Sequence, residues 1–370
     1  MLALQNANEI KTTAEYYRRG LLLGLDLMAE TMAWLDQGLL TEDVPEIALI
    51  EASLCGSHGP IAVADWLGQL PGEFDQPTVA RRLLRGMLTL IDRYPARILE
   101  VTRWIYQMAL DDEWPGLEGE NGMWSFWDYY DMAVDGIHGD PEVIRKDIRA
   151  FLLRAALLVE VALFQQWANA SFPNRGSGEW ECEYGAWDKL YAAVLGFVAA
   201  HPFSDWCQEE IQAVLCALAR DNESGEIADA LEEYSLDLLP PLTKAAIEFG
   251  ERDARWQLAM VLGRIEARGY EPEQMLLKLA HDEDEYVRRR ALDSLTRIGS
   301  PAVEDLAIEM WEREDPHQEW SRMMVLSCLQ KIGSPRLEPL LSDAEQDTRP
   351  HLRATAERIR SEKISEDNDA

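Results

Sequence analysis

The chain has 370 residues, of which 47% are hydrophobic, so it can bury one long core or about two or three ordinary domain cores without metals or disulfides. It carries 35 basic and 67 acidic residues, a formal net charge of −32. A surface this negative opposes binding to nucleic acid and to anionic membranes, and it attracts basic proteins. The same acidity also has a simpler reading, in which it only keeps the chain soluble.

The N-terminal segment and the cysteines indicate a cytoplasmic protein. The first thirty residues place Asn, Glu and Lys ahead of the apolar run and contain no small-residue cleavage site, so they do not resemble a secretion signal. The five cysteines form no C-x-x-C pair, and we expect reduced thiols. The longest apolar stretch, 151–168, is interrupted by Arg154 and Glu160 and predicts a buried helix rather than a membrane span.

Helices are predicted throughout the chain. Nearly every segment between turn signals repeats apolar residues at three- and four-residue spacing, and we find no alternating run that would form a strand. Thr41 is expected to cap a helix that contains 47–50, and Pro141 to open a helix over 141–169. Ser204 precedes a predicted helix over 205–220. The predicted fold class is therefore all-α.

The segment 104–144 has the most unusual composition in the chain. It contains no Lys or Arg, yet it holds ten acidic residues and eight aromatic residues. Aromatic side chains provide large rigid contact areas, and neighbouring acids can pair with Lys or Arg of a partner. A second acidic and aromatic segment spans 179–188, and the two would form one acidic groove if they meet. The other interpretation is that the aromatics pack the core while the acids face water.

These two segments supply the predicted partner-binding residues. They are Asp111, Asp112, Glu113, Trp114, Glu118, Glu120, Trp124, Trp127, Asp128, Tyr130, Asp131, Glu179, Trp180, Glu181 and Glu183.

We identify no catalytic or metal-binding pattern and expect no cofactor. No histidine is followed by Glu, so neither an H-E-x-x-H motif nor a His-Glu dipeptide is present. The run 281–284 resembles a ligand cluster but falls in a loop before a repeat, where acids are expected anyway. Cys55 and His58 lie close in sequence, but a helix–helix turn explains them without a catalytic pair.

After residue 250 one pattern recurs. Ile265, Ile298 and Ile332 end three similar segments and lie 33 and 34 residues apart. This period is typical of helical pairs that bury their apolar faces only by stacking on their neighbours. Ile-Gly-Ser-Pro follows at 298–301 and 332–335, where Gly would end one helix and Pro would begin the next. A shorter fourth copy over 350–359 would cap the stack.

The repeat around residue 287 resembles the HEAT family. An acid precedes Val287 and Arg288, and Ala291, Leu295 and Ile298 form the ladder of small and apolar residues that this family shows. The resemblance covers about 251–360 and implies a HEAT-like α-solenoid, a superhelix of helical pairs whose curved surface grips a partner. The first copy departs from the pattern, with Ala before its Arg255.

The predicted organisation has four parts. An N-terminal helical region spans 1–110, and a central helical region with acidic and aromatic loops spans 111–250. HEAT-like repeats occupy 251–360, and a frayed acidic tail follows over 361–370. The sequence leaves open whether 1–250 continues the superhelix.

These features predict a non-enzymatic, protein-binding scaffold. Our leading hypothesis is a bacterial, cytoplasmic immunity protein that binds and neutralises a basic toxin such as a nuclease, because an acidic surface attracts a cationic toxin and can occupy its nucleic-acid groove. The alternative is a general HEAT-like adaptor in a protein assembly. A third reading is a HEAT-like chromophore lyase, which requires a pocket with convergent polar groups.

Overall fold

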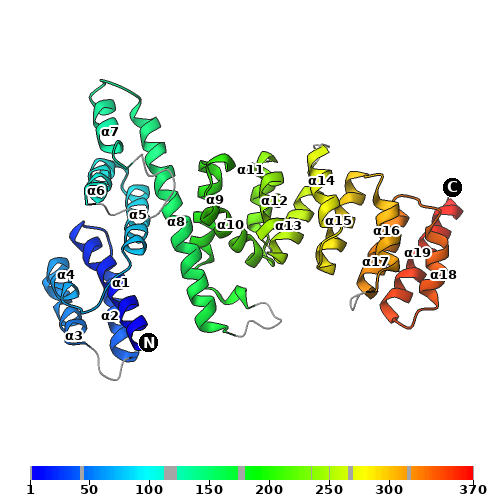
Figure 1. The fold of residues 1–370 in the computed structure, drawn as a ribbon, viewed down its shortest axis with the longest axis horizontal. Coiled ribbons are helices and arrows are strands. Elements are labelled where there is room, and N and C mark those ends of the chain that lie inside the picture. The colour runs from blue at the N-terminus through cyan, green and yellow to red at the C-terminus, as the bar shows by residue number, and fades with distance from the viewer. Residues whose placement is uncertain are drawn as a thin grey trace. The chain divides into compact units, whose positions relative to one another are not determined.

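The computed structural model describes residues 2–41, 46–111, 123–173, 180–234, 236–249, 251–265, 270–314 and 318–369. All regular structure in these residues is helical, which confirms the predicted all-α class (Figure 1). In chain order the α-helices are α1 (Leu2–Leu22), α2 (Met28–Thr41), α3 (Ile47–Leu54), α4 (Pro60–Gly68), α5 (Gln76–Arg93), α6 (Ile98–Leu110), α7 (Phe126–Val134), α8 (Pro141–Ser171), α9 (Trp187–Ala200), α10 (Gln208–Arg220), α11 (Glu226–Tyr234), α12 (Leu239–Phe249), α13 (Arg252–Leu262), α14 (Tyr270–Leu279), α15 (Glu285–Ile298), α16 (Val303–Glu312), α17 (Gln318–Lys331), α18 (Leu337–Glu345) and α19 (Pro350–Asp369).

The chain forms two compact units. The first contains 1–176, 184–201 and 205–210, and the second contains 177–183, 202–204 and 211–370. The sequence predicts boundaries at 110 and 250 instead. The difference arises because α8 packs against both α5 and α9, which ties the residues on either side of position 110 into the first unit.

Helix α8 forms the centre of the first unit. Its first residue is Pro141, and the Asp140 side chain accepts a hydrogen bond from the Glu142 amide, so the predicted helix start is confirmed. All residues of 151–161 are buried, as the apolar run predicts. No described helix combines the length and apolarity that a membrane crossing requires.

Two charged side chains of α8, Arg154 and Glu160, are buried, and each pairs with an opposite charge. The Arg154 guanidinium contacts both carboxylate oxygens of Glu210 at 2.6 and 2.7 Å, and the Arg85 guanidinium lies 2.6 Å from a carboxylate oxygen of Glu160. Buried charges require such partners, since an isolated ion in the interior costs several kcal/mol. The two charged residues that interrupt the apolar run, Arg154 and Glu160, therefore form internal ion pairs.

Two predicted helix starts are wrong. Thr41 is the last residue of α2, and α3 is preceded by Glu46. Helix α10 begins at Gln208, because Phe203–Asp205 forms a separate short 3-10 turn. Ser and Thr favour several kinds of turn besides helix caps, so each residue alone marks a helix start imprecisely.

The second unit contains stacked helical pairs over 239–369. The pairs described there are α12 with α13, α14 with α15, α16 with α17 and α18 with α19. The second helices of successive pairs, α13, α15, α17 and α19, lie side by side (Figure 1). The predicted repeats and the shorter fourth copy are thus confirmed as neighbours in one stack.

The Ile-Gly-Ser-Pro steps end the second helix of a pair and fix its position against the first helix of that pair. Gly299 and Gly333 have φ of 72° and 65°, in the left-handed region predicted for them. The hydroxyl of Ser300 donates to Glu273 at 2.6 Å, and that of Ser334 donates to Glu304 at 3.0 Å. Each serine therefore links the end of the second helix to the first helix of the same pair.

Arginines at equivalent positions contact the loops that connect the two helices of a pair. Arg255 on α13 lies 2.8 Å from the Asp282 carboxylate, in the loop before α15. Arg322 on α17 lies 3.4 Å from the Asp347 carboxylate, in the loop before α19. Arg288, between them, donates to the backbone carbonyls of Asp282 and Glu283, both at 2.7 Å. The arginine of the repeat thus anchors loops rather than contributing to a basic surface.

The C-terminal helix α19 extends to Asp369, so the backbone of 361–369, for which the sequence predicts a frayed tail, is helical. Helix α19 contacts both α17 and α18 and closes the stack.

Close packing between α13 and α15 can be tested at Gly263. A Cβ placed there would lie 2.7 Å from the Ser294 Cα, which is backbone and cannot rotate away. Gly263→Ala should therefore lower the free energy of unfolding by about 1–3 kcal/mol. Gly38→Ala in α2 is the matched control, because no atom lies within 4 Å of its Cβ, and alanine there should be neutral or slightly stabilising. Chemical denaturation of both variants compares the two effects, and equal stabilities would contradict the close packing.

Candidate protein-binding surfaces

Helix α7 exposes both acids and apolar side chains. Asp128, Tyr129, Asp131, Val134 and Asp135 are all exposed, and we call these five residues the α7 face. Tyr129 is 50% and Val134 59% exposed. Within the described residues the three aspartates of this face form no ion pair. The α7 face therefore offers uncompensated negative charge beside apolar contact area, which is the combination that suits a basic protein.

Exposed apolar residues continue on both sides of this face in sequence. Leu110 at the end of α6, Ile137 after α7 and Val143 at the start of α8 are 50%, 70% and 53% exposed. Helix α7 contacts both α6 and α8. Exposed apolar side chains gathered in one part of a chain indicate an interaction site, whereas scattered single ones do not.

The opposite side of α7 belongs to the core. Phe126, Tyr130 and Ala133 are buried, and the Phe126 ring packs against Phe151 of α8 with centroids 5.4 Å apart. The Tyr130 hydroxyl accepts a hydrogen bond from Arg145 at 3.0 Å. Tyr130 was predicted to contact a partner, but it is only 6% exposed and is removed from the candidate surface.

The two tryptophans of this segment have different environments. Trp127 is half-buried, its ring packs against Tyr106 at 5.1 Å, and the Arg103 guanidinium lies 5.7 Å from the Trp127 ring centre. Trp124 is 41% exposed and touches Tyr106 edge-on at 6.2 Å. Both interpretations of the aromatics therefore apply in part, because Trp127 packs internally while Trp124 reaches the surface.

Replacing these tryptophans separates their roles. Trp127→Ala should lower the free energy of unfolding by about 2 kcal/mol, because it removes the packing against Tyr106 and Arg103. Trp124→Ala should lower it by less than about 1 kcal/mol, because much of that side chain is already in water. Urea denaturation measures both values. A larger loss for Trp124→Ala than for Trp127→Ala would contradict this assignment.

Several predicted partner-binding residues lie outside the described residues, namely Asp112, Glu113, Trp114, Glu118, Glu120 and Glu179. Asp111 is exposed, and its carboxylate accepts from the Gln107 amide at 3.0 Å.

The second predicted segment is divided between the units, and its predicted contact residues, up to Glu183, belong to the second unit. Glu183 is exposed and Trp180 is half-buried. Glu181 is only 6% exposed and lies 3.5 Å from Arg220 of α10, so its predicted role at the surface is corrected to an internal ion pair. Because Arg220 also approaches Glu251 and Asp253, one guanidinium compensates several acids there.

The repeats carry a groove that the sequence interpretation missed. It has a volume of about 500 Å³ and runs along the first turns of α13, α15 and α17. Trp256 and Tyr286 pack edge-to-face in it at 5.3 Å, and Trp320 is 44% exposed. Tyr286 and Trp320 occupy equivalent repeat positions, 34 residues apart. The aligned repeats therefore already show an aromatic residue at this position in two successive copies. Such aromatic rings at the surface are typical contact residues in protein complexes.

The two motifs considered for chemistry have structural roles. Cys55–His58 forms a 3-10 turn between α3 and α4, as the turn interpretation predicts. In the 281–284 run, Asp284 caps α15 by accepting from the Tyr286 and Val287 amides, and Asp282 pairs with Arg255. The Cys328 thiol is buried in α17, and burial raises its pKa to about 11, so it is not a reactive thiolate at neutral pH.

Comparison with known proteins agrees with the stacked pairs. A family model for HEAT repeats matches the chain over 239–319 and 273–359. Residues 239–359 are HEAT repeats. The matched part begins at α12, one helix earlier than the predicted start at 251, since α12 supplies the first helix of the first pair. No curated protein and no solved structure matches the chain.

The HEAT assignment explains the arginine run at 288–290. Arg288 anchors the loop before its own helix, while the Arg289 and Arg290 guanidinium groups each lie 4.7 Å from the Tyr286 ring centre. Arg289 also pairs with Glu285 at 2.9 Å. HEAT repeats commonly serve as scaffolds for protein partners, so the groove on the repeats is a candidate binding surface. The α7 face lies outside the matched residues and is a candidate through its exposed acids and apolar side chains.

Proposed function

We propose that the chain is a non-catalytic scaffold that binds a basic protein, with the α7 face as the principal contact. The observation that carries the proposal is the exposure of Asp128, Asp131 and Asp135, along α7 and at its C-terminal end, beside the exposed side chains of Tyr129 and Val134. These three aspartates form no ion pair with any described residue. Ion pairs made across a partially desolvated interface favour a cationic partner, and the apolar neighbours supply buried area.

The total charge supports this choice of partner. A formal net charge of −32 produces a long-range field that speeds encounters with cationic proteins and slows encounters with nucleic acids. HEAT repeats support a protein-binding role in general and do not specify the partner.

In its specific form, the proposal is an acidic, cytoplasmic immunity protein of a bacterium that neutralises a basic toxin, for example a nuclease effector. A nuclease presents a positively charged groove to its substrate, so a negatively charged protein can occupy that groove and exclude the substrate. The second candidate is a HEAT-like adaptor in an assembly, which the HEAT repeats favour equally.

One experiment distinguishes the two. The tagged full-length chain is purified from its native host, the co-purifying protein is identified, and that protein is expressed in a test host alone or with the chain. An immunity protein restores growth that the partner alone abolishes. Growth unaffected by the partner identifies an adaptor. If no co-purifying protein is more basic than the average protein of the host, the scaffold proposal itself is contradicted.

A variant makes the growth assay specific. With Asp128, Asp131 and Asp135 replaced by Asn, the chain should no longer protect cells, whereas replacement of the exposed acids Asp65, Asp188 and Glu226 by the matching amides should leave protection intact. The two variants change the net charge equally, so a difference between them reports on the α7 face.

A further inference from the structure

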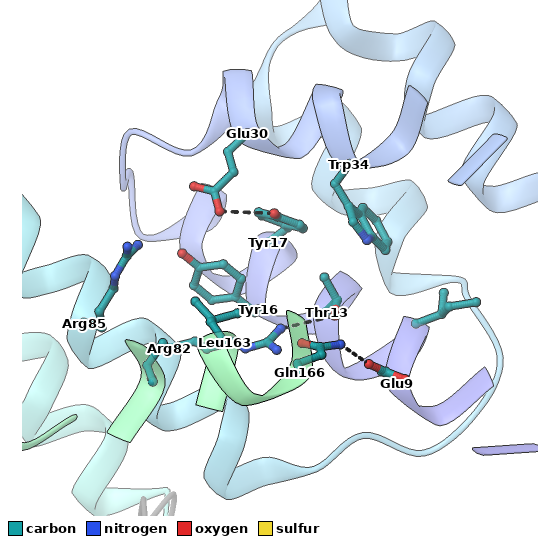
Figure 2. Close-up of a pocket in the computed structure, with 12 residues that line it drawn as sticks. Glu9, Thr13, Tyr16, Tyr17, Glu30, Trp34, Arg82, Arg85, Leu163 and Gln166 are labelled. Atoms are coloured by element: carbon teal, nitrogen blue, oxygen red, sulfur yellow. Dashed lines mark hydrogen bonds between the residues drawn. The ribbon is translucent and has the colours of Figure 1, made fainter. Parts of the chain in front are cut away.

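A polar pocket lies among four helices of the first unit, away from α7 in the sequence. Figure 2 shows its lining, with side chains from α1, α2, α5 and α8 around a cavity of about 380 Å³. Tyr16 and Tyr17 of α1 lie between the α5 arginines and the α2 residues Glu30 and Trp34 (Figure 2). A cavity of this size with a few convergent polar groups is typical of small-molecule sites.

Arg82 is the pocket's uncompensated cation. Its guanidinium donates to the Thr13 hydroxyl at 3.2 Å, and it makes no ion pair with any described residue. Arg82 also lines two adjoining cavities of about 490 and 80 Å³, so several open spaces meet at its side chain. Arg85, one turn further along α5, differs because the buried Glu160 neutralises it at 2.6 Å.

Glu30 is one of two carboxylates of the pocket that pair with no Lys or Arg among the described residues, and Glu9 at the rim is the other. The Glu30 carboxylate accepts from the Tyr17 hydroxyl at 3.3 Å. The Tyr17 and Trp34 rings lie 5.3 Å apart beside it. Aromatic rings next to a carboxylate form a favourable environment for an organic ammonium group, through charge attraction and cation–π interaction.

The tyrosines act as neutral donors in this setting. Burial, followed by the Glu30 carboxylate, raises the pKa of Tyr16 to about 12, and the same causes raise the pKa of Tyr17. Both hydroxyls therefore keep their protons at neutral pH, and because Tyr17 donates to Glu30, the Tyr16 hydroxyl is the one that can donate to an oxygen of a ligand. At the rim, Gln166 of α8 donates to Glu9 of α1.

We propose that this pocket binds a small zwitterion, with the ligand carboxylate on the Arg82 guanidinium and the ligand ammonium group beside Glu30, Tyr17 and Trp34. A guanidinium binds a carboxylate through two parallel hydrogen bonds, and a ligand with both charges compensates both unpaired groups at once. A ligand with two negative charges would be repelled by Glu30, and one with two positive charges by Arg82. This site is independent of the proposed protein-binding function.

The test uses a ladder of linear amino acids in which the separation of the charges increases: glycine, 4-aminobutyrate and 6-aminohexanoate. Hexanoate and hexylamine are the matched probes that lack one charge. Calorimetric titration of the full-length chain should show that the best zwitterion binds about tenfold or more tightly than either single-charge probe, because each removed charge leaves one protein group unpaired.

Three variants assign the contacts. Arg82→Gln should weaken the best zwitterion by about tenfold or more and leave hexylamine unchanged. Glu30→Gln, at an exposed position that folding tolerates, should weaken the zwitterion similarly and leave hexanoate unchanged. Arg81→Gln removes the same charge from the adjacent residue, which does not line this pocket, and should have little effect.

Two results would overturn the proposal. One is that no zwitterion binds more tightly than hexanoate and hexylamine at millimolar concentration. The other is that Arg82→Gln and Arg81→Gln bind the zwitterion equally while circular dichroism shows both to be folded.

Discussion

Replacing Glu210 by alanine should lower the free energy of unfolding of the first unit by about 3–5 kcal/mol. Glu210 is completely buried, and Arg154 is 9% exposed. The carboxylate accepts two hydrogen bonds from Arg154 and one from the Cys207 amide at 2.9 Å. Its removal leaves a guanidinium inside the protein whose remaining hydrogen bond, among the described residues, is to the Asp205 carbonyl at 3.0 Å. A buried charge without its counter-ion is among the most destabilising changes known.

The adjacent residue supplies the control. Glu209 pairs with Arg81 at 2.7 Å, but its side chain is 48% exposed. Glu209→Ala should therefore cost less than about 1 kcal/mol, since exposed ion pairs contribute little. Denaturation with guanidinium chloride measures both variants. Equal losses for the two would contradict the assignment of Arg154 and Glu210 as a buried pair.

A double substitution tests the mechanism further. Arg154→Met combined with Glu210→Leu removes both charges and retains the volume, so it should recover much of the stability lost in Glu210→Ala. If the double variant is as unstable as Glu210→Ala, the cost arises from lost packing or from the Cys207 amide rather than from an unpaired charge.

Reversing the charge of the α7 face should slow association with the basic partner by about tenfold to a hundredfold. The variant replaces Asp128, Asp131 and Asp135 by Lys, which changes attraction to repulsion where the partner first touches the scaffold. All three carboxylates are exposed and form no ion pair within the described residues, so folding should be little affected. Surface plasmon resonance with the purified partner measures the association rate.

The control reverses the same number of charges elsewhere. Asp65, Asp188 and Glu226, on α4, α9 and α11, are also exposed, and replacing them by Lys changes the net charge identically. This variant should slow association only slightly, because none of the three residues belongs to the α7 face that the partner is proposed to contact. If both variants slow association equally, the net charge matters and the α7 face has no special role.

The repeats could be predicted because their signals are local. Gly299 and Gly333 sit where a left-handed residue is needed, and isoleucines 33 and 34 residues apart show the period directly. The helix started by Pro141 was equally predictable, since Asp140 and Pro141 determine its first turn by themselves. The starts of α3 and α10 were not, because Thr41 and Ser204 are compatible with more than one local structure.

The candidate surfaces were predictable in composition but not residue by residue. Tyr130 and Glu181 have the same side-chain types as exposed neighbours, and only tertiary contacts with Arg145 and Arg220 place them inside. The pocket around Arg82 was not predictable, because its lining comes from positions between 9 and 166 on four helices. No sequence pattern relates Arg82 to Glu30. Only the packing of the helices brings these two residues to one cavity.

Electrostatic capture of a cationic protein is tested most directly by the salt dependence of the wild-type association rate. The rate is measured with the co-purified partner at ionic strengths from about 20 mM to about 500 mM, where exposed charges become screened. We predict that it falls by about tenfold or more over this range while the dissociation rate changes much less. An association rate that stays constant across the range, with the complex still forming, would contradict the account.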